Sequence, residues 1–148
     1  MKTSCTFFGH HDASEAIYPM LKNTIEALIT DRGVSRFMVG NNGAFDYMVY
    51  KALCELRRAY SHISVQVVLS RIPEKPPEYP IHDICIPDGI EGVPPRFAIL
   101  HRNRWMVRAS QIVVTYVTHS IGGAAKAEEY AKKQKKEILR LGSRGASL

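Results

Sequence analysis

The sequence has no uninterrupted apolar run that approaches the roughly 20 residues needed to cross a bilayer. Its N-terminus carries only a short apolar patch, which does not fit a secretory signal. Cysteine is scarce as well, with three residues and no CxxC pair, and this odd number argues against a disulfide framework. A reducing, cytoplasmic setting with no membrane partner is the simplest expectation.

Several motifs that would assign a known chemistry are missing. No GxGxxG follows the first expected strand, and neither GxxxxGK[ST] nor GxSxG occurs. Ordinary dinucleotide, P-loop and α/β-hydrolase sites are therefore not expected. The candidate metal ligands are His10, His11, His119 and Asp46, but no two of them lie on one helix face in a ligand motif, so we expect no metal and no cofactor.

The 148 residues are 45% apolar and 23% charged, which indicates one globular domain. We expect that domain over residues 1–142 and a frayed tail over 143–148. The net charge of +6 is uneven, because the segment 96–108 has four arginines and no acidic residue. Lysines also gather at 126–136, where the solvated face of a helix is favoured over a nucleic-acid patch, although nucleic acid stays an alternative partner.

Strand and helix patterns alternate along the whole chain. Capping-box spacing of Asp12 and Glu15 predicts the start of the first helix, and Gly33 its end. The expected strands are 5–8, 37–39, 64–69, 84–86, 111–117 and 137–141, and the expected helices begin near 12, 45, 96 and 124. This alternation predicts an α/β, Rossmann-like, doubly wound and mostly parallel sheet with helices on both faces.

The segments that follow the strands carry the candidate site. Gly9-His10-His11-Asp12 follows the first strand, Gly40 to Gly43 with Asp46 follows the second, and Thr118 to Gly123 follows the strand at 111–117. In an open parallel sheet, ligands bind outside the carboxyl ends of the strands. Glycine lets a backbone approach closely, and helix N-termini favour anions. These residues predict a phosphorylated or otherwise anionic, nucleotide-like ligand.

A set of separated motifs in a fixed order resembles a known group of proteins. The motifs are Phe7-Phe8-Gly9-His10, Val39-Gly40-Asn41 through Asp46, Val93 to Ile99, Arg102 to Met106, Val114 to Ser120 and Gly122 to Ala125. Over about residues 3–141 they resemble small bacterial proteins of the SLOG superfamily, relatives of the Lonely-guy phosphoribohydrolases and of the Smf/DprA proteins. The chain departs from the pattern of this superfamily at the first loop, because members commonly carry Gly-His-Arg where this chain has Gly9-His10-His11.

The resemblance implies a Rossmann-like domain that binds a nucleotide-derived ligand, and it is compatible with a homo-oligomer. The implied ligand-binding residues are Gly9, His10, Gly40, Asn41, Gly43, Asp46, Arg102, Asn103, Arg104, Thr118, Ser120, Gly122 and Gly123.

The enzymatic relatives cleave the N-glycosidic bond of a nucleoside monophosphate, with an acidic residue in a PGGxGTxxE motif and an arginine on the preceding helix. Alignment on Gly122-Gly123 places Glu129 at the acidic position, and Arg104 lies near the arginine position. Ile121, Ala125 and Lys126 replace the proline, the second glycine and the threonine of the motif. Whether the chain is an enzyme is therefore left open by the resemblance.

Three functions follow. The favoured one is a sensor or processing protein that binds a nucleotide-derived small molecule at the carboxyl ends of the strands. The first alternative is a hydrolase of the Lonely-guy type, with Glu129 and Arg104 as its catalytic residues. The second alternative is a nucleic-acid-binding module that uses the basic C-terminal helix.

Overall fold

The computed structural model describes residues 2–142, and the expected tail at 143–148 lies outside the described residues. Six parallel strands form one sheet in the order β4-β3-β2-β1-β5-β6. The strands are β1 (Thr3–Gly9), β2 (Val34–Val39), β3 (Ser64–Val68), β4 (Ile84–Cys85), β5 (Ile112–Tyr116) and β6 (Glu137–Arg140). The chain winds outward from β1 in one direction and then returns to β5, on the other side of β1.

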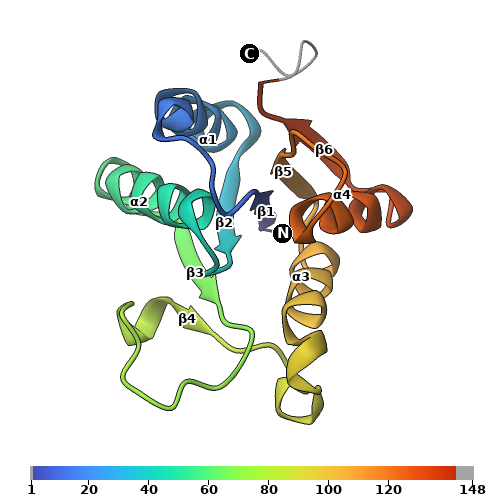
Figure 1. Cartoon of the computed structure of the whole chain (residues 1–148). Coiled ribbons are helices and arrows are strands. Elements are labelled where there is room, and N and C mark those ends of the chain that lie inside the picture. Colours follow the sequence, from blue (N-terminus) through green and yellow to red (C-terminus); the bar gives the residue numbers. More distant parts are fainter. Residues whose placement is uncertain (1, 143–148) are drawn as a thin grey trace.

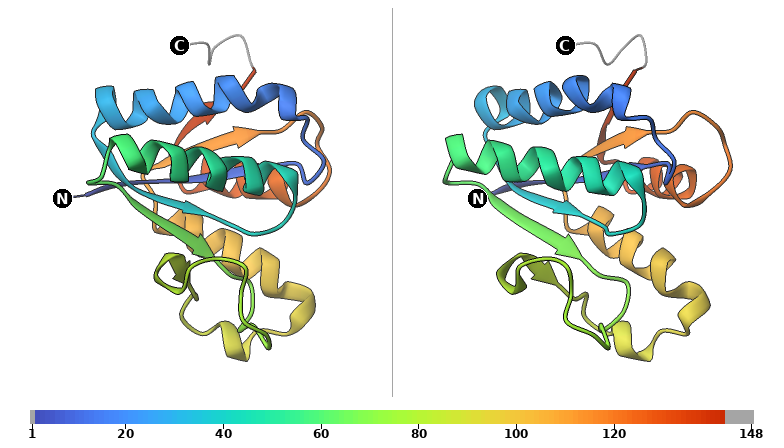
Figure 2. Two further views of the ribbon diagram at one scale, coloured as in Figure 1. Left: turned by 90° about the vertical axis from the view of Figure 1, so that its left-hand side faces the viewer. Right: turned by 60° about the vertical axis from the view of Figure 1, so that its left-hand side comes forward.

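The sheet is covered on both faces (Figure 1). Helices α1 (Tyr18–Arg32) and α2 (Ala44–Ala59) lie on one face, and α3 (Ala98–Arg108) and α4 (Gly123–Lys133) lie on the other. In the two views of Figure 2, α1 and α2 lie side by side on their face of the sheet. The expectation of a single, doubly wound α/β domain is confirmed.

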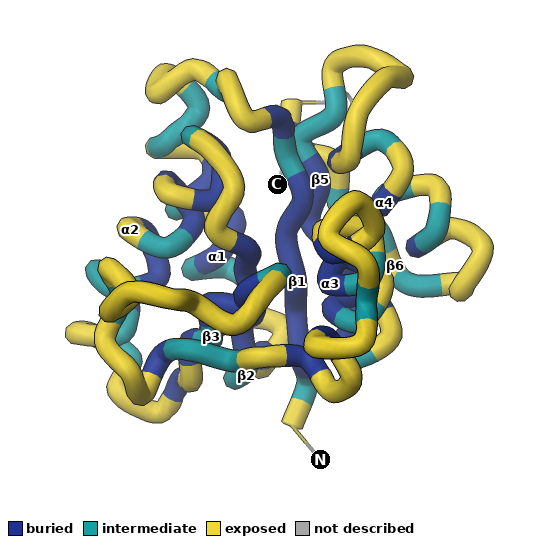
Figure 3. The backbone as a smooth tube through the Cα atoms, turned by 60° about the horizontal axis from the view of Figure 1, so that its bottom comes forward, coloured by how far each residue is buried: buried dark blue, intermediate teal, exposed yellow. Residues whose placement is uncertain are grey.

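Burial on both faces explains why the central strands are almost continuously apolar. Along β1, Phe7 belongs to the core beneath α1 and α2, while Phe8 belongs to the core beneath α3 and α4. Met38 of β2 packs with Phe8, and Phe37 packs with Phe7 at 6.1 Å between ring centroids. Figure 3 shows β1 as the buried axis of the molecule.

Two helix starts differ from the sequence expectations. The expected capping by Asp12 is wrong, because the Ser14 hydroxyl accepts from the Ala16 N–H and opens a 3₁₀ turn, Glu15–Ile17, ahead of α1. Similarly, Pro95–Phe97 forms a 3₁₀ turn, so α3 begins at Ala98 rather than at residue 96. Gly33 ends α1 at φ 67°, as expected of a C-terminal cap.

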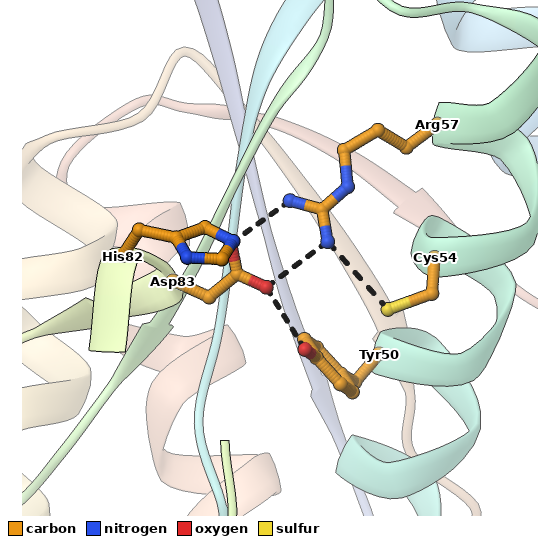
Figure 4. Close-up of polar contacts among 5 residues, drawn as sticks. All are labelled: Tyr50, Cys54, Arg57, His82 and Asp83. Atoms are coloured by element: carbon orange, nitrogen blue, oxygen red, sulfur yellow. Dashed lines mark hydrogen bonds and ion pairs between the residues drawn. The ribbon is translucent and has the colours of Figure 1, made fainter. Parts of the chain in front are cut away.

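The long proline-rich connection between β3 and β4 is anchored to α2 (Figure 4). Asp83, which is 1% exposed, accepts hydrogen bonds from the Arg57 guanidinium at 2.8 and 3.0 Å and from the Tyr50 hydroxyl at 2.9 Å. Tyr79 packs edge-on against Tyr50, with 5.0 Å between ring centroids. Burial alone would raise the pKa of Asp83, but the hydrogen bonds from Arg57 and Tyr50 lower it.

The three cysteines, Cys5, Cys54 and Cys85, are free thiols. No helix within residues 2–142 is long and apolar enough to pass through a bilayer.

Candidate functional site

The order of strands reverses between β1 and β5, and a cleft of about 380 Å³ lies at the carboxyl ends of these strands. The loops after β1, β2 and β5 all contribute to it, together with the start of α4 and one face of α3. Its lining includes Gly9, His10, His11, Asp12, Asn42, Asp46, Ile99, Arg102, Asn103, His119, Ile121, Gly122 and Gly123. Such a crevice is where open α/β sheets bind their ligands.

Two glycines at the carboxyl ends of β1 and β2, Gly9 and Gly40, make room for side chains that pack against the backbone. A Cβ on Gly9 would lie 2.3 Å from the ring of Phe45, so α2 packs directly on the β1 backbone there. A Cβ on Gly40 would lie 2.8 Å from the guanidinium of Arg102. Both positions therefore require glycine for close approach, not for an unusual φ.

Arg102 is 2% exposed and joins three elements beneath the cleft. Its Nε donates to Oδ1 of Asn103 at 2.9 Å, and its Nη1 donates to Asn41 Oδ1 at 3.2 Å and to the Val68 carbonyl at 3.1 Å. Its Nη2 donates to Asn42 Oδ1 at 2.8 Å. All of these hydrogen bonds are made within the protein. The geometry therefore gives Arg102 the role of positioning the side chains of Asn41, Asn42 and Asn103.

Asp46, in the first turn of α2, is a buried acid on the wall of the cleft. Burial raises its pKa to about 6, although the Asn42 N–H at 2.8 Å and the charge of Arg102 both act to lower it. A carboxyl group with this pKa changes its protonation state near pH 6, where it can either accept or donate a hydrogen bond.

Two histidines hold the loop after β5 against the loop after β1. The backbone N–H of Thr118 donates to Nε2 of His10 at 2.8 Å, which requires that nitrogen to be unprotonated. The His119 ring stacks on His10 with 3.8 Å between centroids. Burial, followed by the charge of His119, lowers the pKa of His10, in agreement with this accepting role.

The N-terminus of α4 faces the cleft without a side-chain cap. Its N-cap, Gly122, has φ 105°, a conformation that favours glycine, and Gly122 and Gly123 line the cleft. By contrast, the first N–H of α2, from Ala44, donates to the His11 carbonyl at 2.7 Å. Of these two helix starts, the one on α4 is therefore left open to an anion.

Asn103 stands beside that helix start. It is 8% exposed, and its Nδ2 lies 3.9 Å from the position of a Cβ on Gly123. Its Oδ1 accepts from Arg102, which fixes the orientation of the amide and turns Nδ2 toward the cleft. Within residues 2–142, this Nδ2 has no hydrogen-bond partner.

A second cleft, of about 310 Å³, lies between α3 and α4 and shares Ile99, Asn103, Gly122 and Gly123 with the first. We call it the α3–α4 cleft; it is otherwise lined by Arg96, Phe97, Leu100, Arg104, Lys126, Ala127 and Tyr130.

The structure brings together only part of the set of residues predicted from sequence. Those that line one of the two clefts are Gly9, His10, Asp46, Arg102, Asn103, Arg104, Gly122 and Gly123. Those that line neither are Gly40, Asn41, Gly43, Thr118, Ser120 and Glu129.

Glu129 is the most consequential of the outlying residues. It is exposed, whereas α4 turns Ala124, Ala127 and Ala131 toward the sheet. Because an α-helix turns by about 100° per residue, Glu129 lies on the side of α4 opposite to these buried alanines. Arg104 lines the α3–α4 cleft, with its guanidinium 5.1 Å from the centroid of the Tyr130 ring. The two candidate catalytic side chains therefore do not meet in the main cleft.

Sequence reasoning passed over Asn42, which lies in the cleft, in favour of Asn41 beside it. Both asparagines follow β2, and only the path of the turn decides which one faces the cleft. The sequence-based set also omits Lys126 and Tyr130 of the α3–α4 cleft. Their spacing of four residues, which places both on one face of a helix, was the signal that could have identified them. Within residues 2–142, no group of three or more His, Cys, Asp or Glu side chains could hold a metal.

The sequence matches no protein-family model. It also matches no curated protein. Among solved structures, the fold is similar to that of DNA processing protein A (DprA) from Streptococcus pneumoniae, with a TM-score of 0.72 and 13% sequence identity. The match covers 97% of this chain and 52% of that one, so this chain spans about half the length of DprA. The similarity establishes the Rossmann-like fold that this chain shares with DprA.

Proposed function

We propose that the protein binds a nucleotide-derived small molecule in the main cleft, as a sensor or processing protein. One observation carries the proposal: the uncapped N-terminus of α4 and the free Nδ2 of the buried Asn103 point into the same cleft. A phosphate group is an anion with several acceptor oxygens, and it satisfies both kinds of donor.

The remaining lining residues suit the rest of a nucleotide. Asp46 offers carboxyl oxygens to sugar hydroxyl groups, and Asn42 lies on the same wall. The exposed ring of His119 and the 76%-exposed Ile121 offer a surface against which a base packs. The neighbour that shares this fold is named as a DNA processing protein, which agrees with a role that involves nucleotides.

Cleavage of the N-glycosidic bond is not the function that this geometry favours. That reaction needs an acid or base within reach of the bond that breaks, and Glu129 lines neither cleft. Asp46 is the acidic residue with a raised pKa on the cleft wall, but its partners are Asn42 and Arg102 rather than a second carboxylate.

Isothermal titration with AMP, GMP, CMP and UMP tests the proposal against two matched variants. Asn103→Asp keeps an oxygen for Arg102 but replaces the free Nδ2 donor with a charged acceptor, which repels phosphate. We expect it to weaken binding by about tenfold or more, equal to about 1.4 kcal/mol. Asn41→Asp makes the same change at a second asparagine that is hydrogen-bonded to Arg102 but lies outside the cleft, and this variant should bind within about twofold of the parent.

Binding should also raise the melting temperature, because a ligand at about 100 times its Kd stabilises the folded state by about 2.7 kcal/mol. The proposal fails if none of the four nucleotides binds at millimolar concentration. It also fails if Asn103→Asp and Asn41→Asp weaken binding equally.

A further inference from the structure

The α3–α4 cleft carries an unusual concentration of unpaired positive charge. Arg96, Arg104 and Lys126 line it, and no acidic residue does. Within the described residues 2–142, none of the three forms an ion pair. Arg104 lies over the Tyr130 ring and Arg96 over the Phe97 ring, contacts that orient the guanidinium groups but leave their charge uncompensated.

The walls of the α3–α4 cleft are apolar. Phe97, Leu100 and Ala127 contribute to them, and Phe97 and Leu100 remain 46% and 37% exposed. Apolar walls displace water from a bound anion and so strengthen its attraction to the surrounding cations. A cleft with this lining fits an anionic group better than a neutral sugar or base.

The α3–α4 cleft is also continuous with the main cleft. Asn103, Gly122 and Gly123 line both, so the start of α4 is their common wall. A phosphate held there by the main cleft therefore has the cationic cleft directly beside it. Arg104 comes from α3 and Lys126 from α4, so both helices contribute a cation to this cleft.

We infer that the α3–α4 cleft is a subsite for a further phosphate, and that the ligand is a nucleotide that carries more than one phosphate group. The inference rests on the proposed function and deepens it. The first phosphate lies at the start of α4 beside Asn103, and the next extends between Arg104 and Lys126. Two cations that bind only the additional phosphate give selectivity for nucleoside di- and triphosphates over monophosphates.

The test compares AMP, ATP and inorganic tripolyphosphate by isothermal titration without divalent cations. The site variant is Arg104→Gln with Lys126→Gln. The control variant is Lys132→Gln with Lys133→Gln, which removes the same charge from exposed positions of α4 outside the cleft. Melting temperatures check that both variants fold.

We expect ATP to bind the parent protein about tenfold or more tightly than AMP and tripolyphosphate. The site variant should lose this preference for ATP while it binds AMP within about twofold of the parent, and the control variant should keep the preference. The inference is overturned if ATP binds no more tightly than AMP, if tripolyphosphate binds as tightly as ATP, or if both variants lose affinity equally. Binding of AMP without a preference for ATP removes this inference alone, whereas no binding of any nucleotide removes the proposed function as well.

Discussion

At the scale of single residues, Gly40 shows how the site depends on space rather than on side-chain chemistry. A Cβ there would meet the Arg102 guanidinium at 2.8 Å and Asp46 Oδ2 at 3.0 Å. We expect Gly40→Ala to displace Arg102 from its buried hydrogen bonds and to lower the free energy of unfolding by about 2–4 kcal/mol. Urea denaturation measures this change, with Gly92→Ala, where a Cβ meets nothing within 4 Å, as the control. Equal stability of the two variants would contradict the role given to Arg102.

The raised pKa of Asp46 predicts a pH dependence of stability that is opposite in sign to that of most acidic residues. Its pKa is raised from 3.8 to about 6 by burial, so the folded state binds more protons than the unfolded state between these values. Asp46 therefore makes the protein less stable as the pH rises from about 4 to about 6, by about 3 kcal/mol in total.

The Asp46→Asn variant removes this titration. Relative to the parent protein, its free energy of unfolding should increase across the same pH interval and stay constant above it. Urea denaturation at pH 4, 5, 6 and 7 measures the difference, and parallel stability curves for the two proteins would show that Asp46 does not titrate there.

At the scale of elements, the loop after β5 depends on His10. Because the pKa of His10 is lowered by burial, its hydrogen bond from Thr118 is fully present above about pH 6.5 and is lost as the pH falls through the lowered pKa. His10→Phe keeps a ring for His119 to stack on but removes the acceptor. We expect the free energy of unfolding of the variant to be about 1 kcal/mol lower than that of the parent protein at pH 7.5. In urea denaturation, this difference between the two proteins should become smaller as the pH is lowered. A stability difference that does not change with pH would show that the hydrogen bond to His10 does not hold the loop after β5.

The connection between β3 and β4 depends on Asp83. Asp83→Asn removes the charge that pairs with Arg57, whose side chain is 30% exposed, and we expect a loss of about 2 kcal/mol in stability. Hydrogen exchange should become faster across residues 70–86. The exposed Asp88→Asn is the control, and it should leave the exchange unchanged. Faster exchange in both variants would mean that the anchor in Figure 4 does not hold the loop.

At the scale of the whole molecule, the sequence predicts the architecture well and the site only in part. The apolar runs of β1, β2 and β5 and the stripe on α2 are strong periodic signals, because burial on both faces of the sheet demands them. The choice of site residues depends instead on single turns. Asn42 rather than Asn41 faces the cleft, and Arg102 bonds within the chain, because tertiary contacts decide which donors remain free.

The central claim concerns the whole molecule: loops that are far apart in sequence form one binding cleft at the reversal of strand order. Backbone amide shifts in ¹⁵N-labelled protein, followed by NMR during titration with AMP, test it most directly. The account predicts saturable shift changes that cluster at Gly9, Asn42, Asn103 and Gly123 together. Shift changes confined to the lysine-rich end of α4, or to only one of the loops, would contradict it.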